Sequence, residues 1–150
     1  MSRLPQLPKN ISDEMDEILQ KSRESYQEDD IETALQFAHE AWGLIPEPKE
    51  KWDYYPQSLS AAFVEDYTDL KNVNETKKWI KIAYKMFNDP DRTSHYILSV
   101  EARSLYKLDL LDVSYDVFDR IFELYGREGF QGENMDYSEF YFTERAKRQD

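Results

Sequence analysis

The sequence of 150 residues contains no cysteine and only two histidines. The absence of cysteine excludes disulfides, thiolate nucleophiles and cysteine-based metal sites, and it suits a reducing compartment. Glycine and proline are also scarce, with four and six residues. So few glycines cannot supply a phosphate-binding loop, and neither GxGxxG nor GxxxxGK[ST] occurs in the sequence.

Long apolar runs are missing as well. No stretch approaches the roughly 18 apolar residues that a membrane-spanning helix needs. The first residues, MSRLPQLPKN, lack the apolar core and the small-residue cleavage site of a signal peptide. We therefore expect a cytoplasmic protein that does not associate with membranes.

Positive charge is under-represented, and the formal net charge is −12. The excess is uneven, with −7 in residues 1–50, 0 in residues 51–100 and −5 in residues 101–150. Such a surface repels nucleic acid and attracts basic partners, so the expected partner is a basic protein and not a nucleic acid. Solubility alone is the alternative explanation of the same charge.

What the sequence does contain is apolar residues at helical spacing, in three stretches that each include a small residue near the start. The first small residues, Ala34, Thr76 and Ser114, lie 42 and then 38 residues apart. The stripes consist of Ile31, Ala34, Leu35, Ala38, Ala41, Trp42 and Ile45; of Thr76, Trp79, Ile80, Ala83 and Phe87; and of Leu111, Ser114, Phe118, Ile121, Phe122 and Tyr125. Trp42, Trp79 and Phe118 are expected in the core because each fits its stripe.

This pattern predicts a single all-α domain over residues 1–150. Helix pairs are expected at about 12–46, 57–90 and 93–126, followed by a C-terminal helix at about 135–145. Ser12 is the expected N-cap of the first helix, and Gly126 is expected to take a left-handed C-terminal cap. The aromatic linker residues Trp52, Tyr54 and Tyr55 should pack back onto the helices, and the final KRQD should fray.

These helix pairs resemble the tetratricopeptide (TPR) family. The matching residues are Ala34, Ala38, Ala41 and Pro46 in the first pair; Phe63 and Tyr67 in the second; and Leu98, Ala102, Leu105, Ser114, Phe118 and Ile121 in the third. The resemblance implies a right-handed array of three antiparallel helix pairs with a C-terminal capping helix. Lys21 or Ser22 departs from the family, which usually has a large apolar residue there, and a plain helical bundle stays open as the alternative.

A narrower resemblance concerns the linker WGLIPEPK with Trp52, and the tail GREGFQGEN with Tyr137 and Phe140. Both are similar to segments of short acidic bacterial TPR-like proteins. Members of that group are often encoded beside secreted polymorphic toxins, such as Rhs-type toxins, and are read as candidate immunity proteins. This resemblance implies a protein that binds and neutralises a toxin domain.

The TPR resemblance also implies where a partner binds, because the first helix of each pair lines a concave groove in that family. The positions carried over are Glu17, Gln20, Glu24 and Glu28; Ser58, Ala62, Glu65 and Asp69; and Tyr96, Arg103, Tyr106 and Lys107. Peptide-carboxylate binders of the family use several Lys, Arg and Asn residues there. Few such residues occur at these positions, so a basic polypeptide suits the groove better than an acidic tail.

A second candidate surface comes from spacing alone. Asp112, Asp116, Asp119 and Glu123 are separated by four, three and four residues and share one helical face. They form either a solubilising surface or a docking stripe for a basic partner.

Reactive groups do not converge in the sequence. His39 and His95 lie in different pairs, and His39–Glu40 lacks the second histidine of a zinc-binding HExxH helix. The carboxylates at positions 13–17 and 28–30 do not follow a calcium-loop pattern. We therefore expect no catalytic residue, metal or cofactor. The resulting hypothesis is a non-catalytic protein-binding module, most specifically an immunity protein; a general adaptor is the alternative, an enzyme comes third, and the oligomeric state is open.

Overall fold

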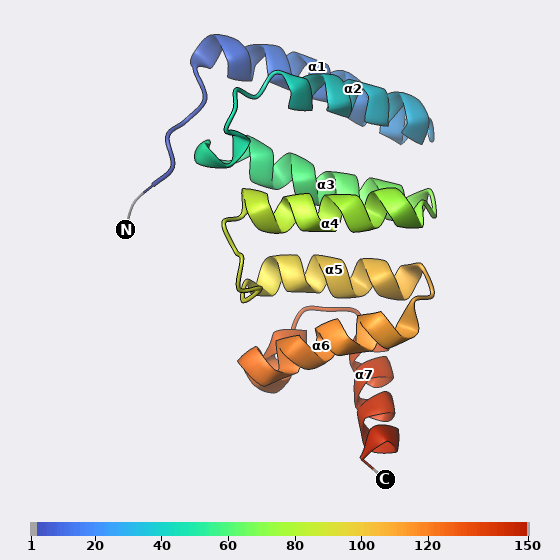
Figure 1. The fold of residues 1–150 in the computed structure, drawn as a ribbon. Coiled ribbons are helices and arrows are strands. Elements are labelled where there is room, and N and C mark those ends of the chain that lie inside the picture. The colour runs from blue at the N-terminus through green and yellow to red at the C-terminus, as the bar shows by residue number, and fades with distance from the viewer. Residues whose placement is uncertain (1–2, 150) are drawn as a thin grey trace. The chain divides into compact units, whose positions relative to one another are not determined.

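The computed structural model describes residues 3–149, in which every regular element is helical (Figure 1). The elements are α1 (Lys9–Gln27), α2 (Ile31–Gly43), the 3-10 helix η1 (Lys49–Lys51), α3 (Tyr55–Asp69), α4 (Val73–Met86), α5 (His95–Lys107), α6 (Leu111–Tyr125), the 3-10 helix η2 (Gly126–Phe130) and α7 (Met135–Arg148). The expected all-α fold class is confirmed. None of these helices combines the length and apolar character needed to cross a membrane.

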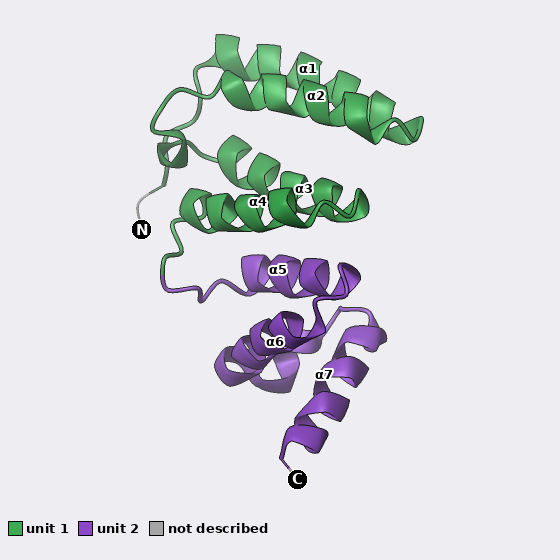
Figure 2. Ribbon diagram, turned by 45° about the vertical axis from the view of Figure 1, so that its right-hand side comes forward, with its two compact units in different colours: residues 1–90 green, residues 91–150 purple. Residues whose placement is uncertain are grey.

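The helices belong to two compact units (Figure 2). Unit 1 ends at Pro90 and contains α1 to α4; α1 packs on α2, α3 packs on α4, and α2 also contacts α3. Unit 2 begins at Asp91 and contains α5 to α7; α5 packs on α6, and both η2 and α7 pack against α6. In each unit, helices that follow one another in the sequence therefore make the main contacts.

The turns after α1, α3 and α5 share one geometry. Asp29, Lys71 and Asp109 have φ values of 61°, 59° and 62°. In each turn the amide of the following residue donates to a carbonyl five residues back, as Asp30 does to Ser25 at 2.9 Å. This is the Schellman termination of a helix, in which the positive-φ residue is usually glycine. The three positions lie 42 and 38 residues apart, the same intervals that separate the small residues of the stripes.

Those small residues lie where paired helices approach closely. Ala34, Thr76 and Ser114 are 2%, 0% and 0% exposed. The Ser22 hydroxyl on α1 donates to the Ala34 carbonyl on α2 at 2.7 Å, and the Ser114 hydroxyl on α6 donates to the Ala102 carbonyl on α5 at 2.8 Å. A hydroxyl reaches the neighbouring backbone only when no large side chain separates the helices. The departure at Ser22 therefore has a structural role.

Each unit has an aromatic core. In unit 1 the rings of Phe63 and Trp79 stack with centroids 4.1 Å apart, and Trp42 meets Trp79 edge-on at 5.1 Å. In unit 2 the ring of Phe118 stacks on Phe130 at 5.8 Å, beside the fully buried Tyr141. Trp79 and Phe118 are buried as expected, whereas Trp42 is half-buried.

The structure differs from the prediction at three helix ends. Ser12 is not the N-cap of α1: the helix begins at Lys9, the Pro8 carbonyl accepts the amides of Ile11 and Ser12 at 3.0 Å, and the Ser12 hydroxyl donates to Lys9. Pro8 contributes its carbonyl to the first turn, and no side chain caps this helix.

Of the final KRQD segment, which we expected to fray, Lys147 and Arg148 are helical, Gln149 is the C-cap of α7, and Asp150 lies outside the described residues. The Arg148 guanidinium lies 3.8 Å from the Tyr115 ring centroid and 3.3 Å from Asp112, which holds the last turn of α7 against α6.

Gly126 does have a positive φ of 66°, but its ψ of −155° differs from the left-handed helical cap that we expected. This combination of dihedral angles is essentially restricted to glycine. The residue ends α6 and starts η2.

Candidate functional site

A groove of about 430 Å³ opens in unit 1, between α1, α2 and α3. Its lining combines carboxylates, tyrosines and small residues, with one arginine. The lining residues are Asp16, Leu19, Ser22, Arg23 and Tyr26 from α1; Ala38 from α2; and Tyr54, Tyr55, Ser58, Leu59, Ala62, Glu65 and Asp66 from the α3 side. Its volume falls in the range of small ligand pockets, and its acidic, aromatic surface suits a cationic group.

Two tyrosines in the lining bond to carboxylates on another helix. The Tyr55 hydroxyl donates to Asp16 at 2.7 Å, and the Tyr26 hydroxyl donates to Asp69 at 2.8 Å. Burial and the bond to Asp16 raise the pKa of Tyr55 to about 12. The bond to Asp69 and burial raise the pKa of Tyr26 to about 12. Because these hydroxyls are already engaged, the ring faces are the parts that remain for a ligand.

Tyr54 stands at the edge of the groove in an unusual backbone conformation. Its φ of 74° and ψ of −63° are those of the rare positive-φ γ-turn, closed by the Tyr55 amide donating to the Asp53 carbonyl at 2.9 Å. The Tyr54 side chain is 62% exposed and meets the Tyr55 ring edge-on at 5.1 Å. The expectation that all three linker aromatics pack back is therefore wrong for Tyr54, because the turn directs this ring outward.

Asp66 is the carboxylate of the groove whose environment is most perturbed. Burial, with smaller contributions from Asp69 and Glu65, raises the pKa of Asp66 from 3.8 to about 7. Within residues 3–149 no side chain donates a hydrogen bond to this carboxylate or forms an ion pair with it. A carboxyl group in such surroundings is a favourable place for an incoming cation.

The groove positions that the TPR resemblance implies lie in or beside the lining on α3 but outside it on α1. On α3, Ser58, Ala62 and Glu65 line the groove, and Asp69 adjoins it through Tyr26. On α1 the predicted positions Glu17, Gln20, Glu24 and Glu28 are exposed but outside the lining. The lining residues of α1 precede them by about one position, which is a rotation of roughly 100° around a helix. A role for Glu17, Glu24 and Glu28 in binding stays a prediction.

Sequence reasoning missed Asp16, Arg23, Tyr26 and Asp66 as lining residues, and it treated Tyr54 and Tyr55 as packing residues. The buried face of α1, which contains Met15 and Ile18, could have predicted how this helix is rotated about its axis. Ser22 points at α2, which turns the neighbouring side chains of α1 toward α3.

In unit 2 the predicted groove positions contact the chain's own C-terminal segment. The Arg103 guanidinium lies 3.2 Å from the Glu133 carboxylate. The Tyr106 ring contacts the rings of Tyr137 and Phe140 at 5.3 and 5.1 Å. Tyr96 remains 53% exposed. α7 and Glu133, which precedes it, thus contact two of the positions that the resemblance assigns to a partner.

The acidic stripe on α6 is also partly engaged. Asp112 pairs with Arg148 at 3.3 Å, and the half-buried Asp119 accepts a short hydrogen bond from Tyr141. Asp116 and Glu123 are exposed. The stripe is therefore both a surface feature and part of the contact with α7.

The two histidines have structural partners. His39 Nε2 lies 2.8 Å from the Tyr67 hydroxyl, and burial lowers the pKa of His39 below 6.5. His95 Nε2 lies 2.6 Å from the Gly129 carbonyl, which joins the start of α5 to η2. Across residues 3–149 no three His, Asp or Glu side chains are grouped so that they could hold a metal ion.

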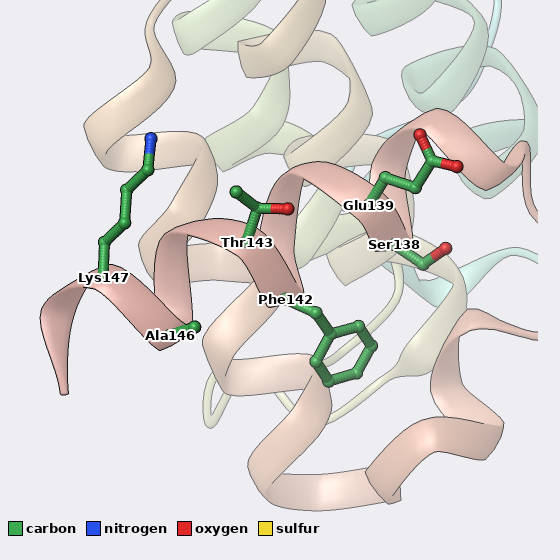
Figure 3. A pocket seen from close by; sticks show the side chains of 6 residues that line it. All are labelled: Ser138, Glu139, Phe142, Thr143, Ala146 and Lys147. Atoms are coloured by element: carbon green, nitrogen blue, oxygen red, sulfur yellow. The ribbon is translucent and has the colours of Figure 1, made fainter. Parts of the chain in front are cut away.

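Another hollow follows the surface of α7 (Figure 3). It is lined by Ser138, Glu139, Phe142, Thr143, Ala146 and Lys147, all from that single helix. Side chains that project from one helix do not converge on a ligand, so this surface offers no chemistry comparable to the groove.

Comparison with known proteins adds no assignment to this geometry. No protein-family model, no curated protein sequence and no solved structure matches the chain.

Proposed function

We propose that this protein is a TPR-like, non-catalytic binding module whose groove in unit 1 takes a segment of a basic polypeptide. The observation that carries the proposal is the groove itself, in which Asp16, Glu65 and Asp66 surround a lining of tyrosines and small residues. Tyrosine is enriched in protein interfaces because its ring offers a large contact area and its hydroxyl a polar end. The carboxylates select the sign of the partner's charge.

The most specific form of this function is an immunity protein that binds a toxin domain and blocks it. The net charge of −12 supports this form. A nuclease or another enzyme that acts on nucleic acid has a cationic cleft, and an acidic protein complements such a cleft. Charge complementarity of this kind raises association rates by roughly 10- to 1,000-fold at low salt.

Co-expression tests the proposal. The protein should rescue cells from the toxin encoded beside its gene, and it should co-purify with that toxin. Failure of both rescue and co-purification would reject the immunity role. Binding without rescue would instead favour a general adaptor that uses the same groove for a peptide or helix.

A pair of variants tests the groove in the same assay. Ala62→Arg places a long cationic side chain in the lining, whereas Gln36→Arg makes the same change of charge on an exposed position of α2 outside it. We expect Ala62→Arg to weaken binding by at least about 100-fold, because it adds both a clash and a repulsive charge. Gln36→Arg should change it by less than about threefold.

If the two variants behave alike, the groove is not the interface. The exposed stripe residues Asp116 and Glu123 on α6 then become the surface to test, by Asp116→Asn with Glu123→Gln.

A further inference from the structure

The carboxylate of Asp66 stands apart from the other acidic groups that border the groove. Asp16 and Asp69 each accept a tyrosine hydroxyl, at 2.7 and 2.8 Å, while no donor within residues 3–149 reaches Asp66. Burial of a carboxylate that accepts no hydrogen bond from the protein disfavours its ionised form. A cation brought by a partner would relieve this condition.

The charged and titratable groups around Asp66 come from each element that borders the groove. They are Asp16, Arg23 and Tyr26 on α1; Tyr54 before α3; and Tyr55, Glu65 and Asp69 on α3. α2 contributes only Ala38 to the lining, and the adjacent His39 faces Tyr67. On α4, Glu75 and Lys78 act on His39 and lie outside the lining.

Arg23 is the cation among these groups, and its orientation decides whether it neutralises Asp66. Its guanidinium donates to Gln20 on the same helix at 2.8 Å. No ion pair joins Arg23 to Asp66 within the described residues. The carboxylates of the groove therefore outnumber its cation, and an added positive charge is favoured there.

We propose that the groove receives one arginine side chain of the partner, with its guanidinium on the carboxylate of Asp66 and its plane against the tyrosine rings. This proposal rests on the proposed function, because it names the group by which the basic partner is recognised. Arginine fits better than lysine for two reasons. Its planar fork can bond both oxygens of one carboxylate, and its weakly hydrated plane stacks on aromatic faces. Tyr26 and Tyr55 line the groove, and their hydroxyls are already bonded to Asp69 and Asp16.

Proton uptake at Asp66 should compete with arginine binding. Burial raises the pKa of Asp66 to about 7, so the carboxyl is mostly neutral at pH 6 and mostly ionised at pH 8. Only the ionised form pairs with a guanidinium. The affinity should therefore rise by about tenfold from pH 6 to pH 8, following the ionised fraction.

The probe for the test is the single-charge peptide acetyl-Gly-Gly-Arg-Gly-Gly-amide, with the lysine peptide of the same length as its partner. Both are titrated into the ¹⁵N-labelled full chain at pH 6 and pH 8, and the chemical shifts of the lining residues are followed. Asp66→Asn removes the charge without changing the size of the side chain. Asp29→Asn is the matched control, since Asp29 is exposed in the α1–α2 turn and outside the lining. Asparagine also tolerates the positive φ of this position.

The expected result is a set of shifts confined to the groove, at least threefold tighter binding of the arginine peptide than of the lysine peptide, and loss of both the binding and its pH dependence in Asp66→Asn alone. Equal binding of the two peptides, or equal effects of Asp66→Asn and Asp29→Asn, would overturn the arginine site. Either result would leave the proposed function standing if the toxin still binds. Conversely, if the arginine peptide binds but the toxin is neither neutralised nor co-purified, the immunity role is rejected and the arginine site is supported.

Discussion

One carboxylate of unit 1, Asp66, differs in its surroundings from the half-buried carboxylates of unit 2. In unit 2 the chain supplies the partners: Arg92 meets Glu101 at 2.6 Å, Arg103 meets Glu133 at 3.2 Å, and Tyr141 donates to Asp119. In unit 1, Asp66 lies half-buried in a groove among other acidic groups and receives no such donor. A carboxylate that is satisfied within the fold contributes to stability, whereas one kept for a partner lowers it until the partner binds.

The largest expected change in the free energy of unfolding comes from replacing Asp66. Its pKa is raised from 3.8 to about 7 in the folded state, so the folded protein holds this proton more tightly than the unfolded chain does. The stabilising contribution is complete below about pH 4 and is lost as the pH rises through 7. Asp66→Asn should therefore raise the free energy of unfolding at pH 8, by up to about 4 kcal/mol, and change it little at pH 4.

Urea denaturation at the two pH values measures this difference, with Asp29→Asn as the control of equal charge. A gain of the same size at pH 4 and pH 8 would show that Asp66 is not a destabilising ionised group.

In unit 2 we expect a substitution that lowers the free energy of unfolding. Tyr141→Phe removes the hydroxyl that donates to Asp119, and the ring is 0% exposed. Loss of a bond to a charged acceptor should lower stability by about 1.5–3 kcal/mol. Tyr26→Phe removes a hydroxyl that donates to an exposed aspartate in unit 1, and it should cost less than about 1 kcal/mol. Thermal denaturation of both variants measures the two losses, and equal losses would contradict the expectation that the buried hydrogen bond contributes more than the exposed one.

A smaller effect concerns packing under η2. A Cβ at Gly129 would lie 2.7 Å from Ile121 Cγ2 and 3.1 Å from Tyr125 Cβ. Gly129→Ala should therefore lower stability by about 1–3 kcal/mol and weaken the seat of η2 on α6. Gly43→Ala is the matched control, because a Cβ there has no atom within 4 Å. Urea denaturation of both variants should show a loss for Gly129→Ala only, and an unchanged midpoint would mean that η2 moves aside without cost.

The helices and the repeat interval could be predicted from sequence because they depend on local patterns. Apolar spacing located the six helices α1 to α6, and the small residues Ala34, Thr76 and Ser114 marked the equivalent buried positions. Helix ends were harder to predict. The Schellman turns use Asp29, Lys71 and Asp109, where the usual signal is glycine, and α1 begins after a proline where a serine with a capping side chain was expected.

The groove could be predicted only on one side. On α3 the carried-over positions Ser58, Ala62 and Glu65 line it. On α1 the rotation of the helix is set by its packing on α2, which the pattern within α1 does not specify. A shift of one residue exchanges Glu17 for Asp16 in the lining. The raised pKa of Asp66 depends mainly on burial, which results from folding, so no local sequence pattern predicts it.

The recurring Schellman turns bear on where the chain tolerates changes in length. The turn geometry stays constant while the interval between turns falls from 42 to 38 residues. Most of the difference lies in the connections at 44–54 and 87–94, which join one pair of helices to the next. Insertions that would break a hairpin at 28–30 or 70–72 should thus be accommodated after Pro90, and this junction is the natural place to splice a reporter or an affinity tag into the interior of the chain.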